Sequence, residues 1–410
     1  NVNPTMIPHG NDWNAIGAVY AALYFSRYYP DLEIGNRILE KMDVYWEPNM
    51  TNWKVNEDCP GYGDITLTGN FNWALHRPDM RYIEPPTERL RQMATYDMLI
   101  TDNTGRVSGF GDASGLSGDY LVAALPLSGW LYRDGRFMWW WDHHGGQPTR
   151  YWVPPEVLPR ERPDDLLGVA VAPLDDWIYR RTNYEPARSF PREECFDKMT
   201  LRPGFEGSDE YLSLSGFGYG FHSHADANAI IRFEDEGEIF LYDDGYMIPS
   251  LSEHNSIIVL RDGWAGPVPE LSQVVAQADF DDMGIFTSRL NDYNGVQWDR
   301  SLIWAKDDYV LVVDELEAEE PGRYDFQCIY RTLGATELDG RRWTARKGEA
   351  RMTLIAASDA ALSQKQSAST SLNSDPFPIS EARRLIESDG AQLRTGQAYH
   401  FANLFYADPA

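Results

Sequence analysis

The first third of the chain carries apolar residues at three- and four-residue steps. Between residues 11 and 29 these apolar positions are Trp13, Ile16, Val19, Tyr20, Leu23 and Tyr24. This period is that of an amphipathic helix, and Pro30 provides a stop signal directly after it. Similar periodicity, broken by Pro, Gly or Asn clusters, predicts further helices at residues 32–45, 65–75, 87–100 and 116–132.

A proline-rich stretch follows the predicted helices. Its prolines are Pro148, Pro154, Pro155, Pro159 and Pro163. Proline fixes φ and lacks a backbone donor, so a continuous helix or a central strand is disfavoured here. We therefore expect a helical domain at residues 1–145, a connection at 146–173 and a second domain at 174–410.

In the second domain the hydrophobic period changes from about 3.6 to two. Alternating or β-branched segments occur at residues 211–214, 229–233, 239–242, 256–260, 301–305, 309–313 and 352–356. Short strands separated by charged turns predict packed antiparallel sheets, as in a β-sandwich, rather than alternating βαβ units. The sequence therefore predicts an α+β multidomain protein.

Composition narrows the class of protein. The chain has 410 residues, with 43% hydrophobic residues and a formal net charge of −27. This charge argues against nucleic acid and anionic membranes as partners, and no apolar run is long enough to span a membrane. The three cysteines are too few and too scattered for a disulfide framework, so a metal would need His and carboxylate ligands.

The most informative stretch runs from residue 216 to residue 259. It contains His222 and His224 two residues apart, followed by Asp243 and His254. On a strand, residues two apart point to the same face. Two histidines and a carboxylate can bind zinc, but they can equally cap turns or satisfy hydrogen bonds in a core. From the residues alone both interpretations stay open.

Together these pieces resemble a known family. A glycine-rich approach to His222-Ser223-His224-Ala225-Asp226, then Asp243-Asp244-Gly245-Tyr246, then His254-Asn255 before an apolar strand, resembles the β-domain of the heparinase II/III-like polysaccharide lyases. The resemblance implies an incomplete (α/α) toroid followed by an antiparallel β-sandwich. This is the order that the periodicity predicts independently.

A second motif lies in the helical region. The sequence Asn56-Glu57-Asp58-Cys59-Pro60-Gly61-Tyr62 is similar to the acidic, glycine and tyrosine turn of that family. About fifty residues earlier the family has an Asn followed by a His, and here Asn11 matches whereas Asp12 replaces the His. A helix N-cap is the alternative interpretation of Asn11, and an ordinary buried aromatic that of Tyr62.

The resemblance implies a role for each of these residues. Asn11 and His222 would hold the substrate carboxylate while Tyr62 transfers protons, and Tyr246 is the alternative proton-transfer residue. A zinc ion would brace the β-domain rather than activate a water, because elimination needs none. Its implied ligands are His224, Asp243 and His254, with Asp244 as the alternative to Asp243.

We therefore expect a carbon–oxygen lyase that cleaves an anionic, uronic-acid-containing polysaccharide by β-elimination and is periplasmic or secreted. The polymer, the choice of endo or exo action and the oligomeric state stay open. The helical region is short for a toroid, and no signal peptide is visible, which suggests a processed chain or part of a longer one. A non-catalytic carbohydrate-binding protein is one alternative. The other is a glycoside hydrolase that uses a pair among Glu57, Asp58, Asp64 and Asp112.

Overall fold

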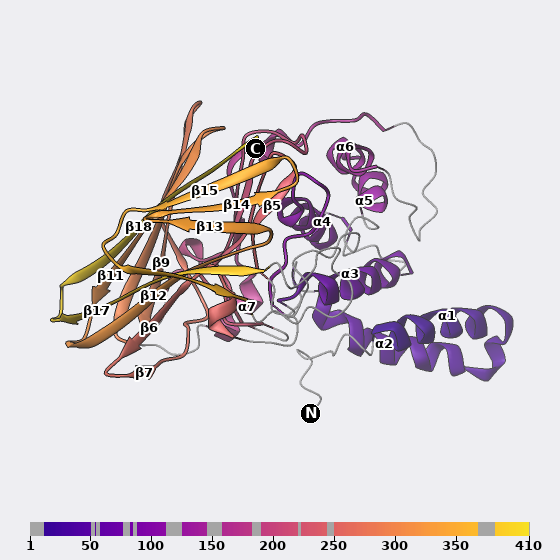
Figure 1. The fold of residues 1–410 in the computed structure, drawn as a ribbon. Coiled ribbons are helices and arrows are strands. Elements are labelled where there is room, and N and C mark those ends of the chain that lie inside the picture. Colours follow the sequence, from indigo (N-terminus) through magenta and orange to yellow (C-terminus); the bar gives the residue numbers. More distant parts are fainter. Residues whose placement is uncertain are drawn as a thin grey trace. The chain divides into compact units, whose positions relative to one another are not determined.

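The computed structural model describes most of the chain. It covers residues 12–50, 54, 58–76, 83–84, 88–111, 125–145, 158–182, 190–219, 223–243, 250–367 and 382–409, leaving out the side chains of 12–13, 47–50, 61–68, 177 and 181–182. The described residues form seven α-helices and two antiparallel sheets, which confirms the α+β prediction (Figure 1).

The chain gathers into two compact units, and we describe each by itself. The helical unit comprises residues 1–98, 119–163 and 175–177, and the β unit comprises residues 99–118, 164–174 and 178–410. None of the described helices is long and apolar enough to cross a membrane.

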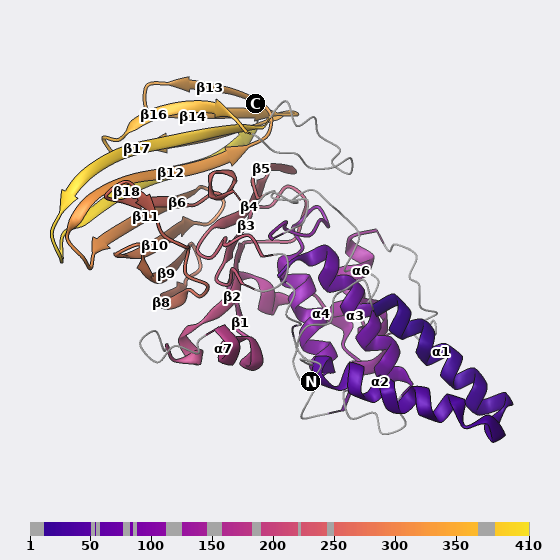
Figure 2. The same cartoon turned by 90° about the horizontal axis from the view of Figure 1, so that it is seen from below.

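The helical unit begins with a hairpin of two long helices, α1 (Asp12–Tyr28) and α2 (Ile34–Met50) (Figure 2). As the sequence predicts, α1 ends before Pro30, which starts a short 3-10 turn, Pro30–Leu32. Glu33 then has a left-handed φ of 52°, which reverses the chain so that α2 can return along α1.

Four more helices belong mainly to this unit: α3 (Pro60–Leu75), α4 (Arg89–Ile100), α5 (Leu125–Tyr132) and α6 (Gly135–His143). Pro60 opens α3 at a position where a missing N–H breaks no helical hydrogen bond. Trp46, Phe71 and Leu90, from three different helices, are fully buried in one shared core. Helix α6 is not among the helices predicted by periodicity; it has only 9 residues, so its period has few turns in which to repeat.

The larger sheet of the β unit has ten strands. Its main path runs β1-β2-β3-β4-β5-β12-β17-β16, and β6 pairs with both β12 and β7. The strands are β1 (Gly168–Pro173), β2 (Phe196–Arg202), β3 (Tyr211–Ser215), β4 (Ile230–Asp235), β5 (Glu238–Tyr242), β6 (Ile257–Arg261), β7 (Trp264–Ala265), β12 (Gly322–Thr332), β16 (Ala361–Gln366) and β17 (Arg383–Leu393).

The second sheet has eight strands in the order β13-β14-β15-β18-β11-β10-β9-β8. The strands are β8 (Gln273–Asp279), β9 (Met283–Tyr293), β10 (Val296–Ala305), β11 (Tyr309–Ala318), β13 (Ala335–Asp339), β14 (Arg342–Lys347), β15 (Ala350–Ala356) and β18 (Ala398–Pro409).

The two sheets of the β unit enclose one hydrophobic core. Phe196 of the first sheet packs edge-on against Phe286 of the second, with ring centroids 5.2 Å apart. Phe233 and Phe405 form a similar pair at 4.7 Å. Contacts of this kind join the inner faces of the sheets, so the β unit is the sandwich that the period-two pattern predicts.

The described units differ from the predicted domains where the chain passes between them. Residues 99–118, expected in the helical domain, group with the β unit. Strand β1 lies inside the range 146–173 that we expected to be a connection, and a helix, α7 (Asp176–Thr182), lies where the second domain was expected to begin. The prolines of this stretch do not prevent β1, because the strand contains Pro173 only as its last residue and ends the path of its sheet.

Candidate functional site

The structure describes the side chains of the three predicted metal ligands but not those of the predicted catalytic residues. Asn11, His222 and Tyr246 lie outside the described residues, as does Asp244. Tyr62 lies in the first turns of α3, and its side chain is not described. The geometry of the candidate site therefore rests on the three predicted metal ligands, the residues His224, Asp243 and His254.

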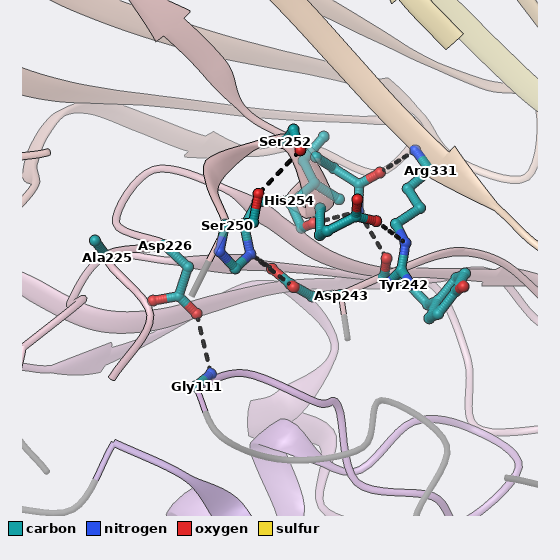
Figure 3. Close-up of polar contacts among 12 residues, drawn as sticks. Gly111, Ala225, Asp226, Tyr242, Asp243, Ser250, Ser252, His254 and Arg331 are labelled. Atoms are coloured by element: carbon teal, nitrogen blue, oxygen red, sulfur yellow. Dashed lines mark hydrogen bonds and ion pairs between the residues drawn. The ribbon is translucent and has the colours of Figure 1, made fainter. Parts of the chain in front are cut away.

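Asp243 and His254 form a direct pair in the β unit (Figure 3). Asp243 directly follows β5, and His254 directly follows a 3-10 turn formed by Leu251–Glu253. The His254 Nδ1 atom lies 2.8 and 2.9 Å from the two carboxylate oxygens of Asp243. Both side chains are almost completely buried, which makes this pair a charge-assisted contact of low solvent exposure.

This pairing changes the charge state that His254 prefers. Burial lowers the pKa of His254, because it disfavours the imidazolium. The charge of Asp243 and its hydrogen bond outweigh burial and raise the pKa to about 8. Asp226 adds a second, more distant negative charge that acts in the same direction.

His224 lies near this pair but reaches it from a loop. Its ring centroid is 6.3 Å from that of His254, and the side chain is 6% exposed. The same-face arrangement that we considered for His222 and His224 requires a strand at this point, but the described residues 223–229 contain none. The physical reason is the backbone: Ala225 and Asn228 adopt left-handed φ values of 58° and 66°, which an extended strand cannot include.

Asp226 is a site residue to which we assigned no role from the sequence, although it stands in the quoted motif. Its Oδ2 accepts a hydrogen bond from the backbone N–H of Gly111 at 3.3 Å, and the two residues belong to the same unit (Figure 3). The side chain is 1% exposed, and its charge acts on His254. Its place in the His224-Ala225-Asp226 sequence was the only signal for it.

The glycines before this loop have a packing reason. A Cβ atom on Gly216 would lie 2.4 Å from the carbonyl oxygen of Phe196, and one on Gly218 would lie 2.7 Å from the backbone nitrogen of Ala227. Real Cβ atoms do not approach backbone this closely, so larger residues would displace the loop that carries His224.

A second buried polar cluster adjoins His254. Glu253 forms ion pairs with Arg331 at 3.3 Å and with Arg384 at 2.9 Å. The Arg331 guanidinium lies 4.3 Å from the Tyr242 ring centroid, and both residues are labelled in Figure 3. Glu253 and Arg331 are nearly or fully buried. These contacts fix the 3-10 turn that directly precedes His254. The sequence pattern did not predict them.

The donor atoms of the site match a zinc ion in chemistry but not in arrangement. The set of two imidazoles and one carboxylate suits zinc chemically, and the buried His254 Nε2 has no hydrogen-bond partner among the described residues. However, Nδ1 of His254 points at Asp243 itself. Within the described part of the chain, no group of three or more His, Cys, Asp or Glu side chains is arranged so that it could hold a metal ion.

The α+β architecture, with helices before a two-sheet β unit and a His/Asp cluster in its loops, corresponds to a heparinase-like fold. Heparinase III is 11% identical, and its alignment covers 99% of this chain and 61% of that chain with a TM-score of 0.69. Heparan sulfate lyase HepC from Pedobacter heparinus is 10% identical, covering 97% of this chain and 60% of that one with a TM-score of 0.67.

These likenesses show the fold alone, because the sequence identities are low. The chain spans about three fifths of the length of the proteins that it resembles. A scan against protein-family models and a search of the curated proteins found no match.

Proposed function

We propose that this protein is a polysaccharide lyase that cleaves a uronic-acid-containing polysaccharide by β-elimination and leaves 4,5-unsaturated uronate ends. The observation that carries the proposal is the likeness of 97% or more of the chain to heparinase III and a heparan sulfate lyase. The quoted motifs support it, because His224, Asp243 and His254, far apart in sequence, gather in one place in the β unit.

Each predicted catalytic residue has a role in the proposed elimination. Removing the C5 proton of a uronate requires donors that stabilise the negative charge that develops on its carboxylate, and Asn11 and His222 supply an amide and an imidazole for this. The Tyr62 hydroxyl protonates the leaving oxygen, and Tyr246 is the alternative residue for this step. The acidic Asp12 beside Asn11 implies that the anionic substrate is gripped differently from the family pattern.

The finer architecture and the setting belong to the same proposal. We infer that the helices α1 to α6 are part of an incomplete (α/α) toroid. The substrate is an anionic polymer, and such large polymers are met outside the cytoplasm, so we infer a periplasmic or secreted protein. The net charge of −27 then requires a locally positive substrate cleft within an acidic surface.

The test is a panel of alginate, glucuronan, ulvan, heparan sulfate and chondroitin, monitored by the ultraviolet absorbance of the unsaturated product. We expect absorbance to rise with at least one polymer, and Tyr62→Phe provides the matched control without the hydroxyl. New reducing ends without absorbance would replace the proposal by a hydrolase. Binding of a polymer without cleavage would replace it by a carbohydrate-binding protein.

We also propose that a structural zinc ion binds His224, Asp243 and His254, with Asp244 as the alternative carboxylate. The support is the direct Asp243–His254 pair, the His224 ring 6.3 Å from that of His254, and the His254 Nε2 atom, which has no hydrogen-bond partner among the described residues. As described, the three side chains are not arranged to hold an ion together, so zinc would have to draw His224 towards the pair. Zinc would tie the loop around His224 to the segments that carry Asp243 and His254, and it would take no part in the elimination.

Elemental analysis of the purified protein tests the zinc proposal. We expect His224→Ala to lower zinc content and thermal stability together. His400→Ala is the matched control, because His400 is 53% exposed and its Nε2 pairs with Glu315 at 2.9 Å, away from the three proposed ligands. Wild-type protein that is active without stoichiometric zinc would contradict the proposal.

A further inference from the structure

A charged residue occupies a core-facing position of β10. Along this strand Val296, Trp298, Leu302 and Trp304 are buried in the sandwich core, and Arg300 falls on the same face. Arg300 is fully buried. An arginine is almost never placed in such a position unless each part of its guanidinium has a partner.

Asp314 of β11 neutralises this charge. The antiparallel register places Arg300 directly opposite Asp314. Arg300 Nε donates to Asp314 Oδ1 at 2.7 Å and Nη2 donates to Oδ2 at 3.1 Å, while Trp298 Nε1 also donates to Oδ1 at 2.7 Å. The carboxylate therefore fixes the plane of the guanidinium.

The third nitrogen of the Arg300 guanidinium, Nη1, bonds to the two segments that carry the candidate site. Nη1 donates to the backbone carbonyl of Asn228 at 2.9 Å and to that of Asn255 at 3.1 Å. Asn228 ends the loop that carries His224 and Asp226, and Asn255 directly follows His254. A single nitrogen atom thus holds both histidine-bearing segments.

Other buried hydrogen bonds join the same two segments. The Ile230 N–H donates to the Asn255 carbonyl at 3.1 Å, and Asn255 Nδ2 donates to the Ile230 carbonyl at 2.9 Å. Ser288 Oγ donates to Asn228 Oδ1 at 2.5 Å. Asn228 keeps a left-handed φ of 66°, a conformation that an unsupported Asn adopts only at some cost.

We propose that Arg300, oriented by Asp314, is a positioning residue that sets the spacing between the 223–229 loop and the 250–256 segment and thereby places His224 and His254. Asp314 supplies the orientation, and the two carbonyl contacts transmit it. The proposal deepens the proposed lyase function and rests on it wherever turnover is the readout.

The decisive variant is Arg300→Lys. Lysine keeps the positive charge beside Asp314, but its ammonium is compact and cannot bond a carboxylate in two places and two carbonyls at once. On a polymer that the wild type cleaves, and well below the melting temperature, we expect kcat to fall about 10- to 100-fold, because the displaced loop continues in sequence to the proposed catalytic residue His222, two residues before His224. We expect KM to change much less.

Hydrogen exchange provides a readout independent of activity. In Arg300→Lys the amides of Asn228, Ile230 and Asn255 should exchange at least about tenfold faster, whereas amides in β18 should keep wild-type rates. If Arg300→Lys does not fold, Asp314→Asn replaces it, because the amide keeps one hydrogen bond to the guanidinium but no longer fixes its plane. We expect the same pattern with a smaller kcat loss.

Arg341→Lys is the matched control. Arg341 also donates to two backbone carbonyls, those of Ala356 and Ala360, and pairs with the buried Glu387 at 3.6 Å. We expect Arg341→Lys to lower the melting temperature while kcat and exchange at Asn228 and Asn255 stay as in the wild type.

Two outcomes separate this proposal from the proposed function. Arg300→Lys with a lower melting temperature but wild-type kcat and wild-type exchange in both segments would reduce Arg300 to a purely structural role. If the wild type cleaves no polymer, the lyase proposal fails. The exchange pattern then still tests the positioning role of Arg300. Faster exchange confined to both segments supports this role, and unchanged exchange overturns it.

Discussion

The α1–α2 hairpin of the helical unit exposes large aromatic side chains, whereas the β unit buries several arginines. On the α1–α2 hairpin, Tyr24 and Tyr28 are 51% and 60% exposed. In the β unit, Arg232, Arg300 and Arg331 are fully buried and bonded to carboxylates or backbone carbonyls. The proposed proton-transfer residue Tyr62 belongs to the helical unit, whereas the candidate site loops of the β unit depend on buried charges. We therefore expect that the substitution of Tyr62 in the helical unit lowers activity without lowering stability. Substitutions of buried arginines in the β unit should lower stability.

Tyr62→Phe should produce the largest effect. The substitution removes the hydroxyl that transfers the proton and keeps the ring, so turnover should fall about 10²- to 10⁴-fold. The melting temperature and the affinity for the polymer should stay close to those of the wild type. Steady-state kinetics and thermal unfolding measure both quantities. Unsaturated product at a near-normal rate would move the role to Tyr246 or to His222.

Arg232→Met tests the coupling of stability to buried charge in the β unit. Arg232 Nη1 lies 3.2 Å from Asp102 Oδ2, with both side chains fully buried, and Nη2 donates to the Val107 carbonyl at 2.9 Å. Removing the guanidinium leaves Asp102 buried without this cation, which should lower the free energy of unfolding by about 3–5 kcal/mol. Urea unfolding measures the change.

The control for this variant is Arg351→Ala in the same unit. Arg351 pairs with Asp408 at 2.9 Å, but both side chains are about one third exposed. Its removal should destabilise the protein far less than removal of Arg232, because exposed ion pairs are screened by water. Equal losses in the two variants would contradict the distinction that we draw between buried and surface charge.

His222→Ala should have a smaller effect that is confined to turnover. If His222 stabilises the developing carboxylate charge, its loss should lower kcat by roughly 10²-fold. Zinc content should stay near that of the wild type, because the proposed ligand is His224, two residues further on. Loss of zinc in His222→Ala would instead make His222 a metal ligand.

The effect that is visible only as a function of pH is the dependence of stability on the protonation of Glu210. Burial raises the pKa of Glu210 to about 8, and the hydrogen bond that Trp304 donates to its carboxylate only partly opposes this. The unfolded chain has the ordinary value of 4.5, so the folded state keeps a proton that the unfolded state loses. The free energy of unfolding therefore falls as pH rises between about 5 and 8.

Glu210→Gln should flatten this decline, because the amide is neutral at every pH in the range. Melting temperatures at several pH values between about 5 and 8 measure the slope for both proteins. An identical slope in the variant would show that other groups carry the pH dependence.

The sequence predicted the elements whose patterns are regular. The segments 211–214, 239–242 and 309–313 became β3, β5 and β11; β11 alternates between buried and partly exposed residues, whereas β3 and β5 are short apolar strands buried almost throughout. Strands β8 and β17 escaped prediction, since β8 is mostly exposed and β17 carries charged residues among its apolar ones. Helix α6 has only 9 residues, so its period has few turns in which to stand out.

The candidate site was predictable only as far as its motif extends. The resemblance grouped His224, Asp243 and His254, although they are spread over thirty-one residues of chain. It could not reveal Arg300, because a charged residue between apolar ones in a strand resembles a solvent-facing position. Nor could local patterns connect Asp102 with Arg232, whose contact depends on how a distant segment folds over β4.

The pair of hydrogen bonds from Arg300 Nη1 has a consequence for the order of folding. Arg300 lies 72 residues from Asn228 and 45 residues from Asn255 along the chain. Both bonds require that β10 and β11 have paired and that their sheet has docked against the other, so they close large loops at a late stage. A refolding chain should therefore acquire native tryptophan fluorescence from the sandwich core first. The protected amides around His254 should appear only afterwards.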